Sequence, residues 1–499
     1  MNAPPKPAFA RVALPILAAA SVLALVLLGD GFGQEPPPLR LIGVGGEPSR
    51  IAESLVAGHG YANPFGLQNP SGPTGWSLPA FVGWIALVQS FFGIAQPWAG
   101  AAFLALDFLC LGLAFGLVAQ IAAHRRGRGA ARLAVCLFAL LLLLWIRRDG
   151  GGWSDKYFVM AFNAALLAAH FAYSARQGRR RLASLALLGG LAGLVNVGSH
   201  LLALGLALSR LRRPGGGPRL AVPLIAVALL PSLIWSARHF AVLGAVLPPK
   251  TNGPFELALN HLHSRDGVLA ASVLCTEHPY MNREAFTRLA RLGEAAYVAE
   301  QGARARALIG ADPLDALRRA GNRALNALVA TRPSTDAVVL EVEPPTDTIE
   351  RLRAAGLATR SGIRSQSWTW LRLDAGMEET RRIFAASGAS QVPSLVADRA
   401  RAMAFYERFA LAPLPRVAGW LIALPATVAA LWLLLRRGKP PSDRVLVFAY
   451  ALLVAPYVIV SHASGYQALV LPLQALLLSA AIATFPLDSK PGAQSSVRP

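Results

Sequence analysis

Long apolar runs recur along this chain of 499 residues and limit what it can fold into. Two of them cover residues 98–123 and 220–244, and few charges interrupt either run. A run of about 18 or more apolar residues can cross the hydrocarbon core of a bilayer as a helix. Charged residues make up only 15% of the chain, whereas soluble domains carry about 25%. The sequence therefore predicts a mainly α-helical, polytopic membrane protein.

Positive charge is concentrated in short segments between the apolar runs, and the net charge is +21. Basic loops of membrane proteins stay on the cytoplasmic side, and this rule accounts for the excess without a nucleic-acid partner. The basic clusters are Arg125, Arg126 and Arg128; Arg176 with Arg179, Arg180 and Arg181; Arg210, Arg212 and Arg213; and Arg436, Arg437 and Lys439. All four clusters lie on the cytoplasmic side only if the apolar segment 78–92 lies in the outer interface and does not cross the membrane. We therefore expect residues 30–97 to form a re-entrant external loop.

The resulting topology has about ten membrane-spanning helices, with both termini in the cytoplasm and the chain in the inner membrane of a bacterium. The expected spans are residues 9–28, 98–123, 132–146, 157–175, 182–195, 199–208, 220–244, 417–435, 445–460 and 468–485. Segment 132–146 and the pair that meets near Asn196 are short for a hydrocarbon core of about 30 Å. Short or broken spans are tolerated where they border a water-filled cavity.

Composition divides the chain into five parts. They are a cytoplasmic tail (1–8), an N-terminal transmembrane bundle (9–244), an external, periplasmic soluble domain (245–416), C-terminal transmembrane helices (417–487) and a disordered cytoplasmic tail (488–499). In the external domain, charges of both signs become frequent and long apolar runs stop. Residue patterns there predict strands at 337–343 and 367–373 and helices at 283–301, 313–329, 348–355 and 395–411. We expect these segments to form a small α/β domain.

The three cysteines provide no disulfide framework. Cys110 and Cys136 lie inside apolar runs, and only Cys275 lies in a polar segment. No group of cysteines and histidines has the spacing of a zinc site. The sequence therefore assigns no metal ligand, and it leaves open whether a divalent metal or another cofactor takes part.

One acid stands out in the predicted external loop. Glu47 follows the first apolar run and is flanked by Gly45, Gly46 and Pro48, which favour a loop and not a helix. A carboxylate just beyond a membrane surface can take a proton from an acceptor hydroxyl as that oxygen attacks. The alternatives are an ordinary solvated acid or an acid favoured by the dipole of a helix start after Pro48. Glu53 is a weaker rival for the same role.

Further candidates lie where other apolar runs meet external segments. The loop before residue 157 combines Arg148, Asp149 and Asp155 with glycines. The acids could activate a hydroxyl or hold a metal, whereas Asp155 could equally cap the next helix and Arg148 could snorkel. Arg238, at the external end of a span, could grip a phosphate or anchor that helix in the interface.

The segment GHGYANPFGLQNPSGPTGW, followed by an amphipathic piece that ends in FFG, resembles the first external loop of a known family. That family is the bacterial polyprenyl-phosphate-dependent membrane glycosyltransferases of GT-C type, related to protein O-mannosyltransferases and to the lipid A aminoarabinose transferase. Its pattern is an acid, then IA-x-x-L-x-x-G-x-GY, NPF and GPT. The matching residues here are Glu47, Ile51, Ala52, Leu55, Gly58, Gly60, Tyr61, Asn63, Pro64, Phe65, Gly72, Pro73 and Thr74.

The likeness is specific in this loop and diffuse elsewhere, although it continues in order to Gly465-Tyr466-Gln467. The chain departs from the family pattern at three points. The first-loop acid is usually Asp and is Glu47 here, the usual Asp-acid doublet is missing, and the element at 337–373 is longer. These departures are compatible with a changed substrate or a lost activity.

The resemblance implies an inverting glycosyltransferase that moves a sugar from a polyprenyl-phosphate carrier to an acceptor hydroxyl at the outer face of the inner membrane. The acceptor would be a glycan, a lipid or a protein. Glu47 would deprotonate that hydroxyl, with a second acid at Asp155 or Asp149. The implied ligands of the donor phosphate are Arg238, Arg148 and Lys250, and the implied substrate-cavity residues are Tyr61, Asn63, Asn260 and His278.

Two other functions compete with this interpretation. A transporter or flippase of a lipid-linked or amphiphilic substrate would have short, broken helices such as those near Asn196 and His200. It should also show two halves of related hydropathy, and the sequence has no internal repeat. A non-catalytic membrane scaffold would leave Glu47 and Asp155 far apart.

Overall fold

The computed structural model describes residues 47–484, with gaps. The gaps fall at residues 68–69, 95, 150–153, 176, 213–216, 264–266, 269–277, 280–282, 330–336, 342–357, 361–367, 373–412, 437, 439 and 461–463. The predicted span 9–28, the predicted helices 348–355 and 395–411 and both predicted tails lie outside the described residues.

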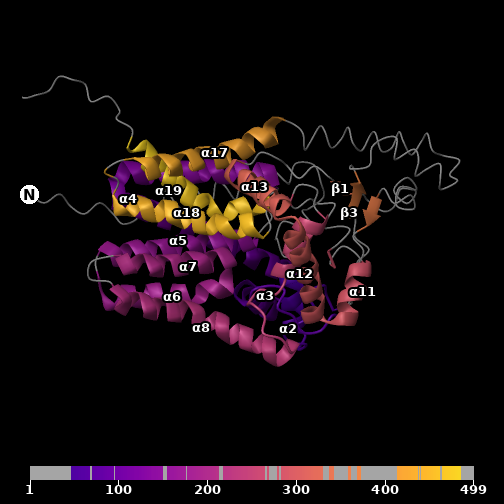
Figure 1. Cartoon of the computed structure of the whole chain (residues 1–499). Coiled ribbons are helices and arrows are strands. Elements are labelled where there is room, and N and C mark those ends of the chain that lie inside the picture. Colours follow the sequence, from indigo (N-terminus) through magenta and orange to yellow (C-terminus); the bar gives the residue numbers. More distant parts are fainter. Residues whose placement is uncertain are drawn as a thin grey trace, which may run out of the picture.

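The described part of the chain is mainly helical (Figure 1). Four helices are long and apolar enough to cross a membrane, namely Trp98–Trp145, Asp155–Ala175, Gly217–Leu243 and Pro441–Ile459. Shorter apolar helices occur at Pro79–Phe92, Val197–Leu211, Gly419–Leu435 and Tyr466–Ile482. The helices agree with a mainly α-helical membrane protein, but their lengths do not support about ten spans.

Helix α4 (Pro97–Asp149) covers two of the predicted spans and turns back on itself at Gly127. Gly127 has φ 84° and ψ −176°, a conformation that suits glycine because it lacks a Cβ atom. The rings of Phe115 and Phe138 lie 4.4 Å apart, whereas an unbroken helix would separate these residues by about 35 Å at 1.5 Å per residue. The two arms of α4 therefore form an antiparallel hairpin.

The helices of the bundle run side by side (Figure 1). With α4 they are α5 (Ser154–Ala175), α6 (Arg179–Val195), α7 (Val197–Leu208), α8 (Gly217–Leu243), α17 (Pro413–Leu435), α18 (Pro441–Ile459) and α19 (Leu471–Ile482). Short turns are η2 (Ser209–Arg212) and η4 (Ser464–Val470). Their core is apolar, with Leu142, Leu202 and Leu446 fully buried. On α8, Leu233 and Ile234 are each 61% exposed, as expected of side chains that face lipid.

Basic residues beside the Gly127 turn mark one end of the bundle, which we call the cationic end. Arg125 and Arg126 both pair with Asp443 at the start of α18, and the contact from Arg126 measures 2.8 Å. The Asp443 side chain is fully buried, so this carboxylate depends on the two guanidinium groups.

A second basic loop reaches the same end. Arg210 donates to the carbonyl oxygen of His170 at 3.0 Å, and the Arg125 guanidinium lies 5.4 Å from the ring centre of Phe171. Because His170 and Phe171 are neighbours near the end of α5, the loops that carry Arg125 and Arg210 are close in space. The basic loops of the cationic end therefore lie close together.

At the opposite end, which we call the loop end, α2 (Glu47–Val56) packs against α3 (Pro79–Phe92). Ile51 of α2, Val82 of α3 and Phe103 of α4 share one apolar cluster. The ring of Phe81 lies 5.9 Å from that of Phe158 near the start of α5. With 14 residues, α3 extends about 21 Å, which is shorter than the hydrocarbon core of a bilayer.

The segment after α8 adds further elements at the loop end. They are α9 (Gly253–Ala258), the π-helical turn η3 (Leu259–His263), α11 (Arg283–Leu292), α12 (Glu294–Ala311) and α13 (Pro313–Val329), followed by β1 (Ala337–Glu341), β2 (Ala358–Arg360) and β3 (Trp368–Arg372). The strands form an antiparallel sheet in the order β1-β3-β2 with Val339 opposite Trp370. The predicted helix 283–301 is two helices, because Gly293 adopts φ 77° between α11 and α12.

Helix α13 belongs to the predicted external domain, yet its C-terminal end packs into the bundle. Asn326 and Ala327 are buried, and Thr427 in the middle of α17 donates its hydroxyl to the carbonyl oxygen of Leu328 at 2.6 Å. The amide of Gln467 also reaches the Asn326 carbonyl oxygen at 3.4 Å. The described part of segment 245–416 is therefore attached to the bundle through α13.

Candidate functional site

Glu47 begins helix α2, so the expectation of a non-helical loop at this residue was wrong. An acid in the first turn is favoured by the helix dipole, which agrees with one of the alternatives from the sequence. It is more than a solvated cap, however, because its Oε1 lies 3.4 Å from Nε2 of His278. The Glu47 side chain is 27% exposed and that of His278 is 12% exposed. The pair is thus shielded from water but still open on one side.

His278 is surrounded by aromatic rings. Its ring centre lies 6.3 Å from that of Phe65, 5.9 Å from Trp76 and 5.4 Å from Phe255, each in an edge-to-face arrangement. Burial lowers the pKa of His278, and the nearby carboxylate of Glu47 acts in the opposite direction. A neutral imidazole beside a carboxylate can accept or pass on a proton.

Two more acids, Glu256 and Asp155, act electrostatically on Tyr466 together with Glu47. The carboxylate of Glu256 has the largest effect in raising the pKa of Tyr466, burial follows, and Asp155 and Glu47 act in the same direction. Asp155 lies in the first turn of α5, and its Oδ2 accepts from Lys156 Nζ at 2.6 Å. The Lys156 ammonium also lies 5.3 Å from the ring centre of Tyr466. The charges of three carboxylates from distant segments therefore act on one phenol, and we call Glu47, Asp155 and Glu256 the acidic site.

Tyr466 is connected through Tyr457 to the break between α6 and α7. Its ring stacks on that of Tyr457 with centres 4.6 Å apart, and the Tyr457 hydroxyl donates to Asn196 Oδ1 at 3.4 Å. Asn196 Oδ1 also accepts from the Gly198 amide at 2.8 Å and so caps α7. The polar break that the sequence shows at Asn196 therefore adjoins the acidic site.

Arg238, a predicted phosphate ligand, holds the first loop. Its Nη1 donates to the Thr74 carbonyl oxygen at 2.8 Å and its Nη2 to the Tyr61 carbonyl oxygen at 3.0 Å. The guanidinium also lies over the rings of Tyr61 and Trp235, at 5.1 and 4.9 Å from their centres. Both terminal nitrogens thus already serve the loop, and the geometry favours this role over phosphate binding.

Tyr61 and Asn63, predicted to line the substrate cavity, shape the loop itself. The Tyr61 hydroxyl donates to the Ser77 carbonyl oxygen at 2.7 Å. Asn63 adopts φ 55°, a left-handed conformation that asparagine tolerates better than most residues. Its Oδ1 accepts from the amides of Ser71 and Gly72 at 3.1 and 3.0 Å. The NPF and GPT parts of the loop are therefore joined through one side chain.

The remaining predicted residues fall into two groups. Lys250 Nζ lies 3.8 Å from Glu256 Oε1, and the buried Asn260 donates to the Glu256 carbonyl oxygen at 2.7 Å, so both support α9 at the acidic site. Arg148 and Asp149 belong to the last turn of α4, and their side chains lie outside the described part of the chain.

A network on α13 connects this end of the molecule to α18. The buried Arg323 donates to the carbonyl oxygens of Val458 at 2.7 Å, Gly267 at 3.0 Å and Ile459 at 3.2 Å. Its Nη2 also lies 3.5 Å from Nε2 of His261. Burial and the nearby cationic Arg323 lower the pKa of His261 to about 4, so the imidazole is neutral at pH 7. Arg323 thereby caps the C-terminal end of α18.

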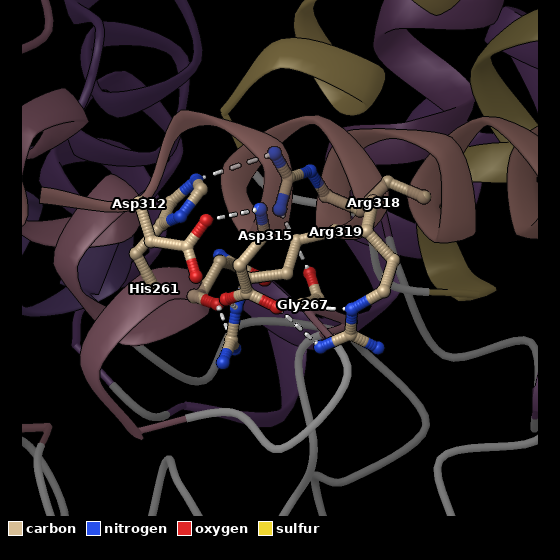
Figure 2. A network of polar contacts seen from close by, with 8 residues as sticks. His261, Gly267, Asp312, Asp315, Arg318 and Arg319 are labelled. Carbon is tan, nitrogen blue, oxygen red and sulfur yellow. Dashed lines mark hydrogen bonds and ion pairs between the residues drawn. The ribbon is translucent and has the colours of Figure 1, made fainter. Parts of the chain in front are cut away.

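Figure 2 shows the outer part of this network, where Asp315 faces two arginines. Asp315 accepts from Arg318 Nε at 2.9 Å and from Arg319 Nε at 2.5 Å. Asp312 Oδ1 accepts from the Asp315 amide at 2.9 Å and so caps α13, while Arg319 reaches the Asn260 carbonyl oxygen at 3.4 Å. The network joins α13 to η3, next to α9 and the acidic site.

Sequence reasoning missed Glu256, Tyr466 and Lys156. Glu256 was one of several polar residues in the loop LPPKTNGPFELALNH, and Tyr466 was part of a diffuse likeness. Lys156 adjoins Asp155 and could have been found as its partner. Within the residues that the structure describes, no group of three or more His, Cys, Asp or Glu is arranged to hold a metal ion.

The structure thus brings Glu47, His278 and Asp155 to one site, and it places Arg238, Tyr61 and Asn63 in the support of the loop beside it. Comparison with family models, with curated proteins and with solved structures gives no match.

Proposed function

We propose that the chain is an inverting membrane glycosyltransferase that transfers a sugar from a polyprenyl-phosphate carrier to an acceptor hydroxyl. The observation that carries the proposal is the pair of Glu47 and His278, 3.4 Å apart, with Asp155 and Glu256 close by. The pair lies at the end of an apolar bundle, where a lipid-linked donor could present its head group. The likeness of the first loop to GT-C enzymes supports the same function.

Glu47 takes the proton of the acceptor hydroxyl while the oxygen attacks the anomeric carbon of the sugar. The bond from that carbon to the phosphate oxygen breaks, its electrons leave with the lipid phosphate, and the configuration inverts. His278 shares the proton with Glu47. Asp155 orients the acceptor, a role in which exact placement supplies much of the rate.

Cations stabilise the departing phosphate. We assign this role to Lys250 and Arg148, while Arg238 keeps the loop in place. The isoprenoid chain lies against the exposed apolar side chains of the bundle, where burial contributes about 25 cal/mol per Å² of apolar surface. The donor therefore gains affinity from its lipid and reactivity from the loop end.

The same proposal includes a finer topology. The two arms of α4 cross separately, as do α5, α8 and α18. The helices α6, α7, α17 and α19 and the segment 9–28 complete about ten spans, Pro79–Phe92 stays in the outer interface, and both termini lie in the cytoplasm. The cationic end faces the cytoplasm and the loop end, with the small α/β domain, faces the periplasm. Support comes from the Gly127 hairpin and from the gathering of the basic loops.

The test is transfer by the purified chain in liposomes with a polyprenyl-phosphate sugar and a mixture of acceptors. We expect the Glu47→Gln variant to lose about 100-fold or more in turnover, because general base catalysis contributes about 10² to 10⁴. Donor binding should persist, since the amide keeps the shape of the side chain.

The matched control is Glu53→Gln, on the same helix. Glu53 pairs with Arg50 at 2.6 Å and lies six residues further along the helix than Glu47, so its replacement should leave the turnover of the folded protein within a few-fold of the wild type. Full turnover in the Glu47→Gln variant, or an equal loss in both variants, would remove the role of Glu47. Movement of the lipid across the bilayer without sugar transfer would favour a flippase.

A further inference from the structure

A buried carboxylate joins three distant segments next to the candidate site. Glu294, the first residue of α12, is 4% exposed. It accepts hydrogen bonds from the hydroxyl of Thr74, from the amide of Gly75 at 2.8 Å and from the hydroxyl of Thr251. The Thr251 amide in turn donates to the Gly75 carbonyl oxygen at 3.0 Å. We call Glu294, Thr74, Gly75 and Thr251 the clasp.

Burial of a carboxylate is costly unless its oxygens are hydrogen-bonded. Burial raises the pKa of Glu294, and the three donors of the clasp act in the opposite direction. An apolar residue could fill the same space without this cost, so stability alone does not explain an acid here. An acid does, however, fix the positions of three donors at once, and this requires a defined geometry.

The clasp fits too closely to allow a different geometry. A Cβ atom on Gly75 would lie 2.4 Å from Cγ2 of Thr251 and 2.5 Å from Nε2 of His239. Contacts below about 3 Å would force the Thr251 methyl group or the His239 ring away, and such overpacking costs about 1–3 kcal/mol in a well-packed core. Only glycine therefore allows the loop to reach Thr251 and Glu294 together.

Both segments held by the clasp continue directly into the walls around His278. Trp76 follows Gly75, and its amide donates to the Thr74 hydroxyl at 3.0 Å. Phe255 is four residues after Thr251 and lies in the first turn of α9. The rings of Trp76 and Phe255 lie 5.3 Å from each other, and both meet the ring of His278 edge to face.

A third ring ties these walls back to α12. Tyr297, one turn after Glu294, is 2% exposed and lies 5.8 Å from Phe255 between ring centres. The position of Glu294 thus determines where Trp76 and Phe255 stand, and those two rings determine how His278 faces Glu47.

We propose that Glu294 is a positioning residue, which holds His278 against Glu47 through Trp76 and Phe255. Glu294 acts on the pair through these two rings. The inference rests on the proposed function for its kinetic consequence, but its effect on His278 stands without it.

The experiment compares Glu294→Ala and Glu294→Gln with the wild type. Alanine removes all three acceptor contacts, whereas glutamine keeps one oxygen for the Gly75 amide and can donate to a threonine hydroxyl. We expect alanine to lower kcat by about 100-fold with little change in the KM for the donor, since small misplacements cost that much. Glutamine should restore most of kcat.

A second measurement follows His278 itself. Nitrogen-15 spectra of histidine-labelled protein in detergent, assigned with a His278→Asn variant, give the titration of its imidazole. We expect Glu294→Ala to move that titration toward higher pH, because His278 becomes better solvated, and Glu294→Gln to keep it close to the wild type. The control Glu300→Gln lies on the same helix in a surface pair with Arg288 and should change neither kcat nor the titration.

Each outcome decides the inference. A wild-type titration of His278 in the Glu294→Ala variant overturns it, whatever happens to kcat. A shifted titration in a chain that transfers no sugar supports the clasp and contradicts the proposed function. If the alanine variant does not fold, Thr251→Val, which removes a single donor, takes its place with the same expected direction.

Discussion

The two ends of the bundle treat charge in opposite ways. At the cationic end, Arg125 and Arg126 close on the buried Asp443, so basic residues are neutralised within the fold. At the loop end, the carboxylates of Glu47, Asp155 and Glu256 act on Tyr466. The first arrangement fixes helices to each other, while the second leaves carboxylates near a partly open surface.

Two arginines of the loop end bind without a carboxylate. Arg125 at the cationic end meets Asp443, whereas Arg238 and Arg323 donate to backbone carbonyl oxygens. Arg210 at the cationic end also donates to a carbonyl oxygen, and Arg318 and Arg319 pair with Asp315, so this mode belongs to individual arginines and not to one end. A guanidinium bound to carbonyls organises loops and helix ends without cancelling a nearby acid. The loop end can therefore contain buried arginines and still keep its carboxylates for chemistry.

The largest effect that we expect from breaking this contrast comes from Asp443→Ala. It leaves two buried guanidinium groups without their carboxylate, which costs about 3–5 kcal/mol in such pairs. Thermal unfolding in detergent should show a much lower midpoint, while the turnover of the molecules that remain folded stays near the wild type because the site is at the other end.

Asp315→Ala is the control for this variant, since Asp315 also pairs with two arginines but faces solvent. Water screens that pair, so its loss should lower the midpoint far less. Equal losses from the two variants would show that the buried pair has no special part in the cationic end.

The pH dependence of the free energy of unfolding gives a smaller effect, which tests the loop end. The pKa of His261 is about 4 in the fold against 6.5 in an unfolded chain, so the unfolded state binds more protons between these values. The free energy of unfolding should therefore fall as pH drops from 6.5 to 4, by less than about 1.4 kcal/mol per pH unit for this one group.

Replacing His261 by glutamine should make the fall in unfolding midpoint between pH 6.5 and 4 shallower, while the matched replacement of the exposed His59 should not. An unchanged slope in the His261→Gln variant would mean that the imidazole does not resist protonation beside Arg323.

The sequence predicted the helices well because apolar runs of sufficient length leave few alternatives. The hairpin within α4 also followed, since Arg125 and Arg126 next to Gly127 mark a basic turn. Element ends were less certain, as with Gly293, which splits a predicted helix in two. The pattern of α13 predicted a soluble helix, because nothing local shows that Arg323 is buried against the end of α18.

The candidate site was only partly predictable. Glu47 stood out because it is an isolated acid in a glycine-rich segment, and His278 followed from a family likeness. Their contact joins residues far apart in the chain, so no spacing rule could have found it. Glu294 and Glu256 gave no local signal, since each looks like an ordinary acid at the start of a short helix.

The central claim is that the two ends face opposite sides of a membrane, with the acids outside. Its most direct test is labelling of single cysteines at His124 and Ala299, in a chain whose Cys110, Cys136 and Cys275 are replaced by alanine. His124 is exposed at the cationic end and Ala299 is exposed on α12. In right-side-out vesicles, a membrane-impermeant maleimide should label position 299 at once and position 124 only after permeabilisation. Immediate labelling at both positions, or at 124 alone, would contradict the account.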